Sequence, residues 1–123
     1  MTEAREDQVV AARARMAELA AKFLERSLRE LAVMRDGLAR LHAGESAALG
    51  EVRDLAHRMC GTGATLGFEA LGDGATRIER LAEPCPAGSP PDAAALTQLG
   101  AGIEALAVEL ARLAAANKRA PGT

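Results

Sequence analysis

The sequence predicts an all-α fold, an antiparallel up-down four-helix bundle with an additional or extended N-terminal helix. Composition is the first reason: 29 of the 123 residues are Ala and 16 are Leu, whereas two are aromatic, a balance that favours packed helices over sheet. Apolar stripes at helical spacing, separated by short breaks rich in Gly or Pro, are the second. We expect a single domain over residues 1–123, with a core over about 20–117 and a frayed tail at 118–123.

The first segment, from about Thr2 to Arg26, is rich in Ala, Glu and Arg and should be helical. We expect its apolar stripe to be buried; the stripe comprises Val9, Met16, Leu19, Ala20 and Phe23. Residues 27–30 read Ser-Leu-Arg-Glu, which has the form of a capping box. The helix therefore either restarts or kinks near Ser27, or continues as one long helix, and the N-terminal segment is expected across one end of the bundle.

A second stripe predicts a core-facing helix up to His42 and consists of Leu31, Met34, Leu38 and Leu41. In the turn that follows, Gly44 is expected in the left-handed conformation and Ser46 is expected to cap the next helix. That helix should run from Ala47 to about Thr65 and end at Gly67.

The helix over residues 47–65 has one apolar and one polar side at 100° per residue. Its core-facing side consists of Val52, Leu55, Ala56, Met59, Gly63 and Leu66. His57 falls nearly opposite, on an outer face that also carries Gly50, Arg53, Asp54, Cys60, Gly61 and Ala64. A glycine inside a helix costs roughly 1 kcal/mol relative to Ala, so Gly61 beside an exposed histidine indicates close approach by another surface.

Two further helices complete the bundle. The first is opened by a stripe of Phe68, Leu71, Ala75, Ile78 and Ala82. The Pro-rich span 84–91 breaks it and is predicted to be a loop. The last helix has the clearest stripe in the sequence, formed by Leu96, Leu99, Ile103, Leu106, Leu110 and Leu113. Beyond Ala116 the chain has nothing to bury and should fray.

Charge and hydropathy exclude several classes of function. The net charge of −2 provides no basic field for a nucleic acid. No stretch approaches the roughly 20 apolar residues that span a membrane, and the charged N-terminus lacks an apolar signal core. We therefore expect a cytoplasmic protein without nucleic-acid or membrane partners, and a monomer.

The sequence offers no metal or cofactor site. Cys60 and Cys85 form no redox or metal motif, and no orienting group accompanies Cys60 and His57 as a nucleophile and base. Asp54 and His57 lack the second such pair that a carboxylate-bridged metal site needs, and His42 is the one other histidine. We expect no metal and no cofactor.

The residues around His57 resemble the signature of histidine phosphotransfer (HPt) domains. The histidine is followed by Gly61-Thr62 and by Gly67-Phe68. The likeness extends upstream to Phe23 and downstream through Glu83, and it covers roughly residues 20–117. Many members carry a lysine three residues after the histidine, a position occupied here by Cys60.

This resemblance implies a phosphocarrier of a bacterial two-component phosphorelay rather than an enzyme. His57 would accept a phosphoryl group and exchange it with an aspartate of receiver domains, in response regulators or hybrid histidine kinases. A neutral imidazole has the necessary lone pair, while the receiver would supply the metal. Arg53 is the best-placed cation, and the other neutralising or docking candidates are Arg58, Cys60, Gly61 and Ala64.

Two other functions stay open. One is a helical adaptor that binds a receiver domain without being phosphorylated. The other is the phosphoacceptor domain of a larger histidine kinase. The absence of an ATP-binding domain from this chain favours a free-standing carrier over the kinase alternative.

Overall fold

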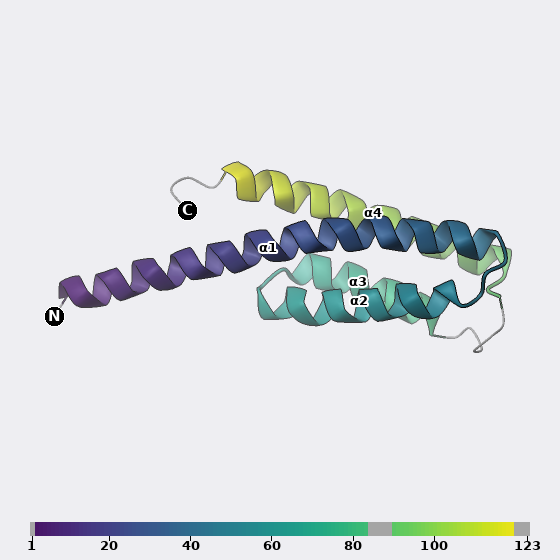
Figure 1. Cartoon of the computed structure of the whole chain (residues 1–123), viewed down its shortest axis with the longest axis horizontal. Coiled ribbons are helices and arrows are strands. Elements are labelled where there is room, and N and C mark those ends of the chain that lie inside the picture. The colour runs from purple at the N-terminus through teal and green to yellow at the C-terminus, as the bar shows by residue number, and fades with distance from the viewer. Residues whose placement is uncertain (1, 84–89, 120–123) are drawn as a thin grey trace.

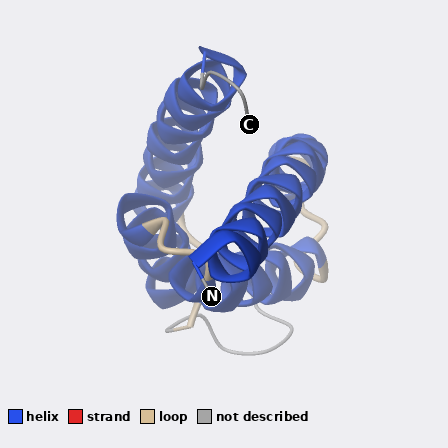
Figure 2. Cartoon of the chain, turned by 90° about the vertical axis from the view of Figure 1, so that its left-hand side faces the viewer, coloured by secondary structure: helices blue, strands red, loops and turns tan. Residues whose placement is uncertain are grey.

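The computed structural model describes residues 2–83 and 90–119, and this part of the chain contains four helices and no strand (Figure 2). The helices are α1 (Thr2–His42), α2 (Ala48–Thr65), α3 (Glu69–Ala82) and α4 (Ala93–Arg119). Each helix packs on its neighbours in chain order, and α4 closes the ring against α1 (Figure 1). The predicted all-α four-helix bundle is confirmed.

The core is built from the stripes predicted for residues 31–41, 52–66, 71–82 and 96–113. Each helix contributes large side chains that are almost fully buried, among them Met34, Met59, Ile78, Ile103 and Leu106. Burial of one such side chain contributes about 1.5 to 3 kcal/mol. The bundle is therefore held mainly by apolar contacts between adjacent helices.

Helix α1 runs through Ser27 without a break. The restart suggested by the capping-box pattern is wrong, and the alternative of one long helix is confirmed. Phe23, Leu24 and Leu31 are buried on both sides of this point, so packing keeps the segment helical where local capping chemistry would favour a start. The side chain of Ser27 is itself buried, and its Oγ has no hydrogen-bond partner among the described residues.

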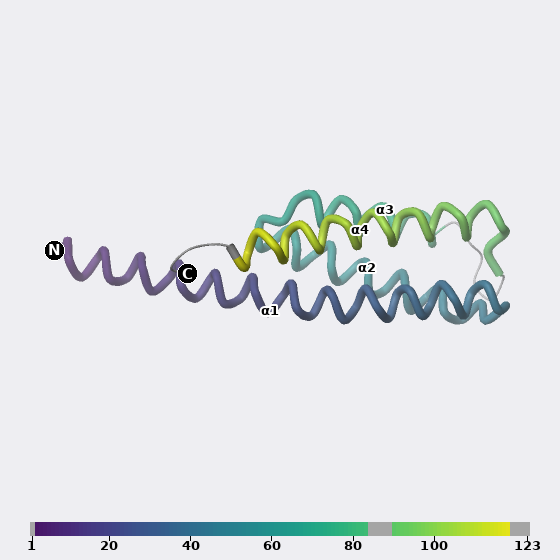
Figure 3. The backbone as a smooth tube through the Cα atoms, turned by 90° about the horizontal axis from the view of Figure 1, so that it is seen from above, coloured from purple at the N-terminus to yellow at the C-terminus, as the bar shows by residue number. Residues whose placement is uncertain are grey.

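The N-terminal part of α1 extends past the bundle rather than across its end (Figures 1 and 3). The bundle ends near Phe23, whose ring stacks on that of Phe68 with the centroids 5.8 Å apart. Beyond this point Val9, Met16 and Leu19 are 44%, 50% and 52% exposed. The prediction that they are buried is wrong, because α1 extends past the helices that would cover them (Figure 1), although Leu19 still lines a pocket with Thr65 and Leu66 at the end of α2.

Gly44 has the predicted left-handed backbone, and Gly67, which was predicted to end the helix, shares it. Gly44 and Gly67 have φ of 93° and 84°, the left-handed region that glycine enters without strain. At the end of α2, the N–H of Gly67 donates to the carbonyl of Ala64 and that of Phe68 donates to the carbonyl of Gly63, at 3.2 and 2.8 Å. These two bonds form a Schellman motif, which stops α2 and turns the chain into α3.

The prediction that Ser46 caps α2 is wrong. Ala47 occupies the N-cap position, and no side chain caps the helix there. The carbonyls of Glu45 and Ser46 instead accept the first N–H groups, from Ala48 and Leu49. Backbone groups of the tight turn thus replace the hydroxyl.

Helix α4 starts after Asp92, whose Oδ1 accepts the N–H of Ala95 at 2.8 Å. Pro90 and Pro91 precede the helix, as predicted, whereas the rest of the Pro-rich span, with Cys85, lies outside the described residues. The helix continues to Arg119, so the prediction of fraying after Ala116 is wrong for residues 117–119. Residues 120–123 also lie outside the described part.

Exposed ion pairs connect the helices near the end opposite to the protruding part of α1. Arg35 on α1 donates to both carboxylate oxygens of Glu104 on α4, at 3.0 and 2.9 Å, and holds the pKa of that carboxyl below its usual range. Arg40 donates to Glu45 and Glu51, which raise its pKa. In the described part of the chain, no helix is both long and apolar enough to cross a bilayer.

Candidate functional site

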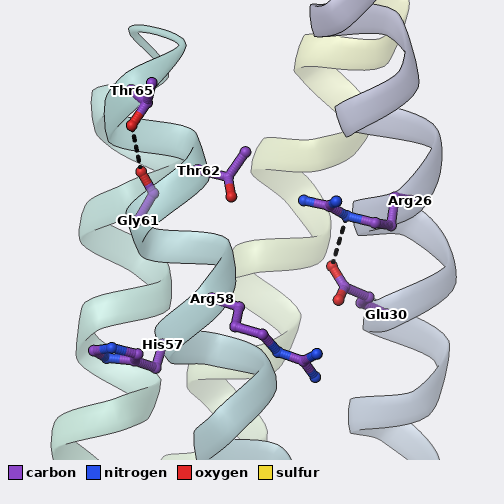
Figure 4. Close-up of a pocket in the computed structure, with 7 residues that line it drawn as sticks. All are labelled: Arg26, Glu30, His57, Arg58, Gly61, Thr62 and Thr65. Atoms are coloured by element: carbon purple, nitrogen blue, oxygen red, sulfur yellow. Dashed lines mark hydrogen bonds and ion pairs between the residues drawn. The ribbon is translucent and has the colours of Figure 1, made fainter.

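His57 projects from the middle of α2, on the side opposite the buried stripe. Its side chain is 73% exposed. Figure 4 shows the imidazole turned away from the groove between α1 and α2, whereas Arg58 on the next residue extends across that groove toward α1. The position confirms that His57 is an outward-facing residue, as the helical periodicity predicts.

One hydrogen bond fixes the imidazole. Nδ1 of His57 lies 2.7 Å from Oε2 of Glu79 on α3, and the Glu79 side chain is 20% exposed. A carboxylate at neutral pH only accepts hydrogen bonds, so Nδ1 is the donor in this pair. In the neutral imidazole, the other ring nitrogen, Nε2, then holds the free lone pair.

A second contact between α2 and α3 lies one helical turn away. Sγ of Cys60 is 2.8 Å from Oγ1 of Thr76. Cys60 follows His57 by three residues and Thr76 precedes Glu79 by three, so the two pairs are successive contacts between antiparallel helices. The prediction that Cys60 shares the outer face with His57 is wrong, because the thiol is half-buried against α3.

Glycines allow α2 and α3 to approach this closely. A Cβ at Gly63 would lie 3.7 Å from the backbone nitrogen of Gly72, and one at Gly72 would lie 3.7 Å from the carbonyl oxygen of Cys60. The helices are thus in backbone contact near the turn at Gly67. This close approach sets the register in which Glu79 reaches His57.

A groove borders the site on the α1 side. It is lined by Arg26, Glu30, His57, Arg58, Gly61, Thr62 and Thr65 (Figure 4). Arg26 pairs with Glu30 at 3.7 Å and stands over the ring of Phe23, 5.8 Å from its centroid. With two guanidinium groups and one carboxylate, the groove walls carry a net positive charge.

A family model described as the Hpt domain matches residues 18–116. The chain belongs to the Hpt domain family. Hpt domains transfer phosphoryl groups through histidine in phosphorelays and interact with receiver domains of response regulators. No curated protein and no solved structure matches the sequence.

The other residues singled out in the sequence lie on the exposed face of α2 around His57 or in the groove between α1 and α2. Gly61 and Ala64 are exposed on the His57 side of α2, and a Cβ at Gly61 would meet nothing within 4 Å. Arg58 and Gly61 share the groove with His57. Arg53 is exposed one turn before His57 and pairs with Asp54 at 3.7 Å.

Sequence reasoning missed Glu79 and Arg26. Glu79 follows Ile78, which belongs to the buried stripe of α3. From this position the sequence could predict that Glu79 is partly buried, but not which residue of α2 lies opposite it. Arg26 lies among several arginines of α1, and nothing in their spacing separates it from the others. Both residues are located only once the helices are packed.

The part of the chain that the structure describes holds no group of three His, Cys, Asp or Glu side chains arranged as metal ligands. His42 is exposed at the end of α1. His57, its partner Glu79 and the neighbouring groove form the candidate site of this Hpt domain.

Proposed function

We propose that this Hpt domain is a cytoplasmic phosphocarrier that accepts a phosphoryl group on Nε2 of His57 and exchanges it with an aspartate of a receiver domain. The observation that carries the proposal is the 2.7 Å hydrogen bond from Nδ1 of His57 to Glu79. It holds an otherwise exposed ring in the tautomer whose outward nitrogen is a nucleophile. A histidine that served only as a solvated surface residue would need no such partner.

The transfer step follows from this arrangement. The lone pair of Nε2 attacks the phosphorus of an aspartyl phosphate, a bond from nitrogen to phosphorus forms, and the bond from phosphorus to the carboxylate oxygen breaks. The aspartate leaves as a carboxylate, and the imidazole gains positive charge. Glu79 stabilises that charge, since its carboxylate remains hydrogen-bonded to Nδ1–H throughout. The reverse reaction returns the phosphoryl group to a receiver.

We assign activation of the phosphoryl group to the receiver, so the chain acts as a carrier rather than an enzyme. Phosphoryl transfer requires an in-line approach and neutralisation of the charge on the equatorial oxygens. This chain supplies an accessible nucleophile and nearby guanidinium groups. Among them, Arg53 is one turn from His57 on the outer face, and Arg58 lies in the groove together with Arg26.

The docking surface that we propose consists of His57, Gly61 and Ala64, with the basic groove beside them. The small residues let a receiver bring its aspartyl phosphate close to the imidazole, because no side chain stands between. The groove offers two guanidinium groups to the acidic residues that surround a receiver's phosphorylation site. The adaptor alternative uses the same surface, but it gives the Glu79 hydrogen bond no role.

Phosphotransfer from loaded receivers tests the proposal. Each receiver domain of the source organism is phosphorylated with radiolabelled acetyl phosphate, freed of excess reagent and mixed with the purified chain. We expect at least one receiver to lose label to this protein within minutes. Binding of a receiver without any transfer would support the adaptor instead, and would overturn the carrier.

A further inference from the structure

The protruding part of α1 carries an apolar stripe whose large side chains are left about half exposed by the rest of the described chain. The stripe repeats at intervals of three and four residues and consists of Val9, Ala12, Met16, Leu19 and Phe23. Phe23 is buried in the bundle, whereas Val9, Met16 and Leu19 are about half exposed. The exposed stripe therefore continues the face by which α1 packs into the core. Most of it precedes residue 18, where the Hpt match begins.

The pattern has the spacing of a coiled-coil seam, in which apolar residues alternate at three and four. A helix of this length that stands alone in water is only marginally stable. A second helix packed on the stripe would stabilise it. The charges on the same segment indicate which helix would pack there.

The two halves of the segment have opposite charge. The first half contains Glu3, Arg5, Glu6 and Asp7, and the second contains Arg13, Arg15 and Glu18. The first half carries a net charge of −2, and the second carries a net charge of +1. Two copies laid antiparallel place the acidic half of each against the basic half of the other, whereas a parallel pair would align like charges.

We propose that two copies of this chain pair through residues 2–19 of α1 as an antiparallel, twofold-symmetric coiled coil. In the favoured register Val9 lies opposite Ala12 of the second copy, and the same register sets Met16 opposite Arg5, whose aliphatic stem covers the thioether. Glu6 then flanks Arg13 of the second copy, and symmetry forms this pair twice. From the sequence alone we expect this stripe to lie in the core and the protein to be a monomer. Because the stripe is exposed, we now propose a dimer instead.

The geometry leaves both bundles free. At 1.5 Å per residue the seam is about 27 Å long, and the end of α4, where Asn117 lies beside Ala14 and Glu18, is on the side of α1 opposite the stripe. The seam contains no residue of the His57 site, so the inference is independent of the proposed function. Because the seam is short, we expect a dimer that dissociates in the micromolar range, where the free energy of association is about −8 kcal/mol.

Sedimentation equilibrium of the whole chain, from about 5 to 500 μM, measures the association. We expect the mass to rise from 12.7 kDa toward twice that value. Met16→Lys should raise the dissociation constant at least about tenfold, because an ammonium group enters the seam opposite Arg5 of the second copy. Val10→Lys is the matched control: Val10 is 65% exposed but lies 100° around the helix from Val9, so the dimer should persist. A chain that stays monomeric throughout, or a dimer that survives Met16→Lys, overturns the proposal.

Charge reversal tests the orientation of the two helices. Glu6→Arg alone should weaken the dimer about threefold or more, because the introduced guanidinium group then faces Arg13 of the second copy, and symmetry repeats this repulsion. The double variant Glu6→Arg, Arg13→Glu should restore the dimer at low salt. If the single reversal has no effect or the double variant is no better than the single one, the antiparallel register is wrong. Far-UV circular dichroism checks that each variant keeps its helix content.

Discussion

Nδ1 of His57 on α2 and Oε2 of Glu79 on α3 lie 2.7 Å apart, and the imidazole is otherwise largely exposed. The hydrogen bond orients the ring and leaves Nε2 as the free nucleophile. Glu79 thus acts as a positioning residue, through the histidine rather than on the phosphoryl group itself.

Glu79→Ala should slow phosphotransfer to His57 about tenfold, which corresponds to the loss of one charge-assisted hydrogen bond at a partly exposed site. The variant loses both the selection of the tautomer and the negative charge that stabilises the phosphorylated ring. Single-turnover transfer from a loaded receiver measures the rate.

Glu79→Gln separates these two effects, because the amide oxygen still accepts Nδ1–H but carries no charge. We expect a loss of about threefold, between wild type and Glu79→Ala. The ¹⁵N chemical shifts of the imidazole report the tautomer: proton on Nδ1 in wild type and in Glu79→Gln, and a mixture in Glu79→Ala. Unchanged shifts and rates in Glu79→Ala would remove Glu79 from the mechanism.

Gly61 tests whether small residues beside His57 serve docking. Gly61→Ala should raise the free energy of unfolding by roughly 0.5 to 1 kcal/mol, because its Cβ meets nothing within 4 Å and glycine weakens a helix. Gly61→Glu should also fold but should transfer poorly, since its side chain stands where a receiver approaches and repels the phosphate. Displacing the reacting atoms by about 1 Å can cost a hundredfold in rate. Normal transfer in Gly61→Glu would show that receivers dock elsewhere.

Replacing Gly37 on α1 by alanine should have the opposite effect on stability from Gly61→Ala. A Cβ there would lie 2.7 Å from Cγ2 of Val52 on α2, which forces the helices or the valine to move. Gly37→Ala should therefore lower the free energy of unfolding by about 1 to 3 kcal/mol, measured by urea denaturation. Equal stability of Gly37→Ala and Gly61→Ala would contradict the close packing of α1 on α2.

The transfer rates of alanine variants test which arginines near His57 offset the charge of the phosphoryl group. The sequence favours Arg53 as the cation that offsets the phosphate, whereas the structure places Arg58 in the groove with His57 and leaves Arg53 beside Asp54. We propose that each of Arg53→Ala and Arg58→Ala slows transfer severalfold, because exposed charge pairs contribute only up to about 1 kcal/mol. Wild-type rates in both variants would assign all of the neutralisation to the receiver.

The helices and their buried faces follow from the sequence because periodicity records which side of each helix meets the core. The spacing of Leu96 to Leu113 and the glycine at position 67 were sufficient to predict α4 and the end of α2. Periodicity cannot show where a stripe stops being covered. For this reason Val9, Met16 and Leu19 read as core residues although the bundle ends at Phe23.

The residues of the candidate site were likewise predictable only in part. His57 and Gly61 could be assigned from one helix, because both lie on its outer face. Glu79 could not, because its contact with His57 depends on the register between α2 and α3, set by the backbone contact of Gly63 with Gly72. Cys60 lies at the edge of two faces, and packing on Thr76 turned it toward α3.

Transfer of label from a phosphorylated receiver to His57→Gln tests the central claim most directly. The substitution keeps a polar side chain at an exposed position, so stability should change by no more than about 0.5 kcal/mol. His42→Gln, at the exposed end of α1, is the matched control. We predict that wild type and His42→Gln acquire label at equal rates and that His57→Gln acquires none; label retained on His57→Gln would contradict the account.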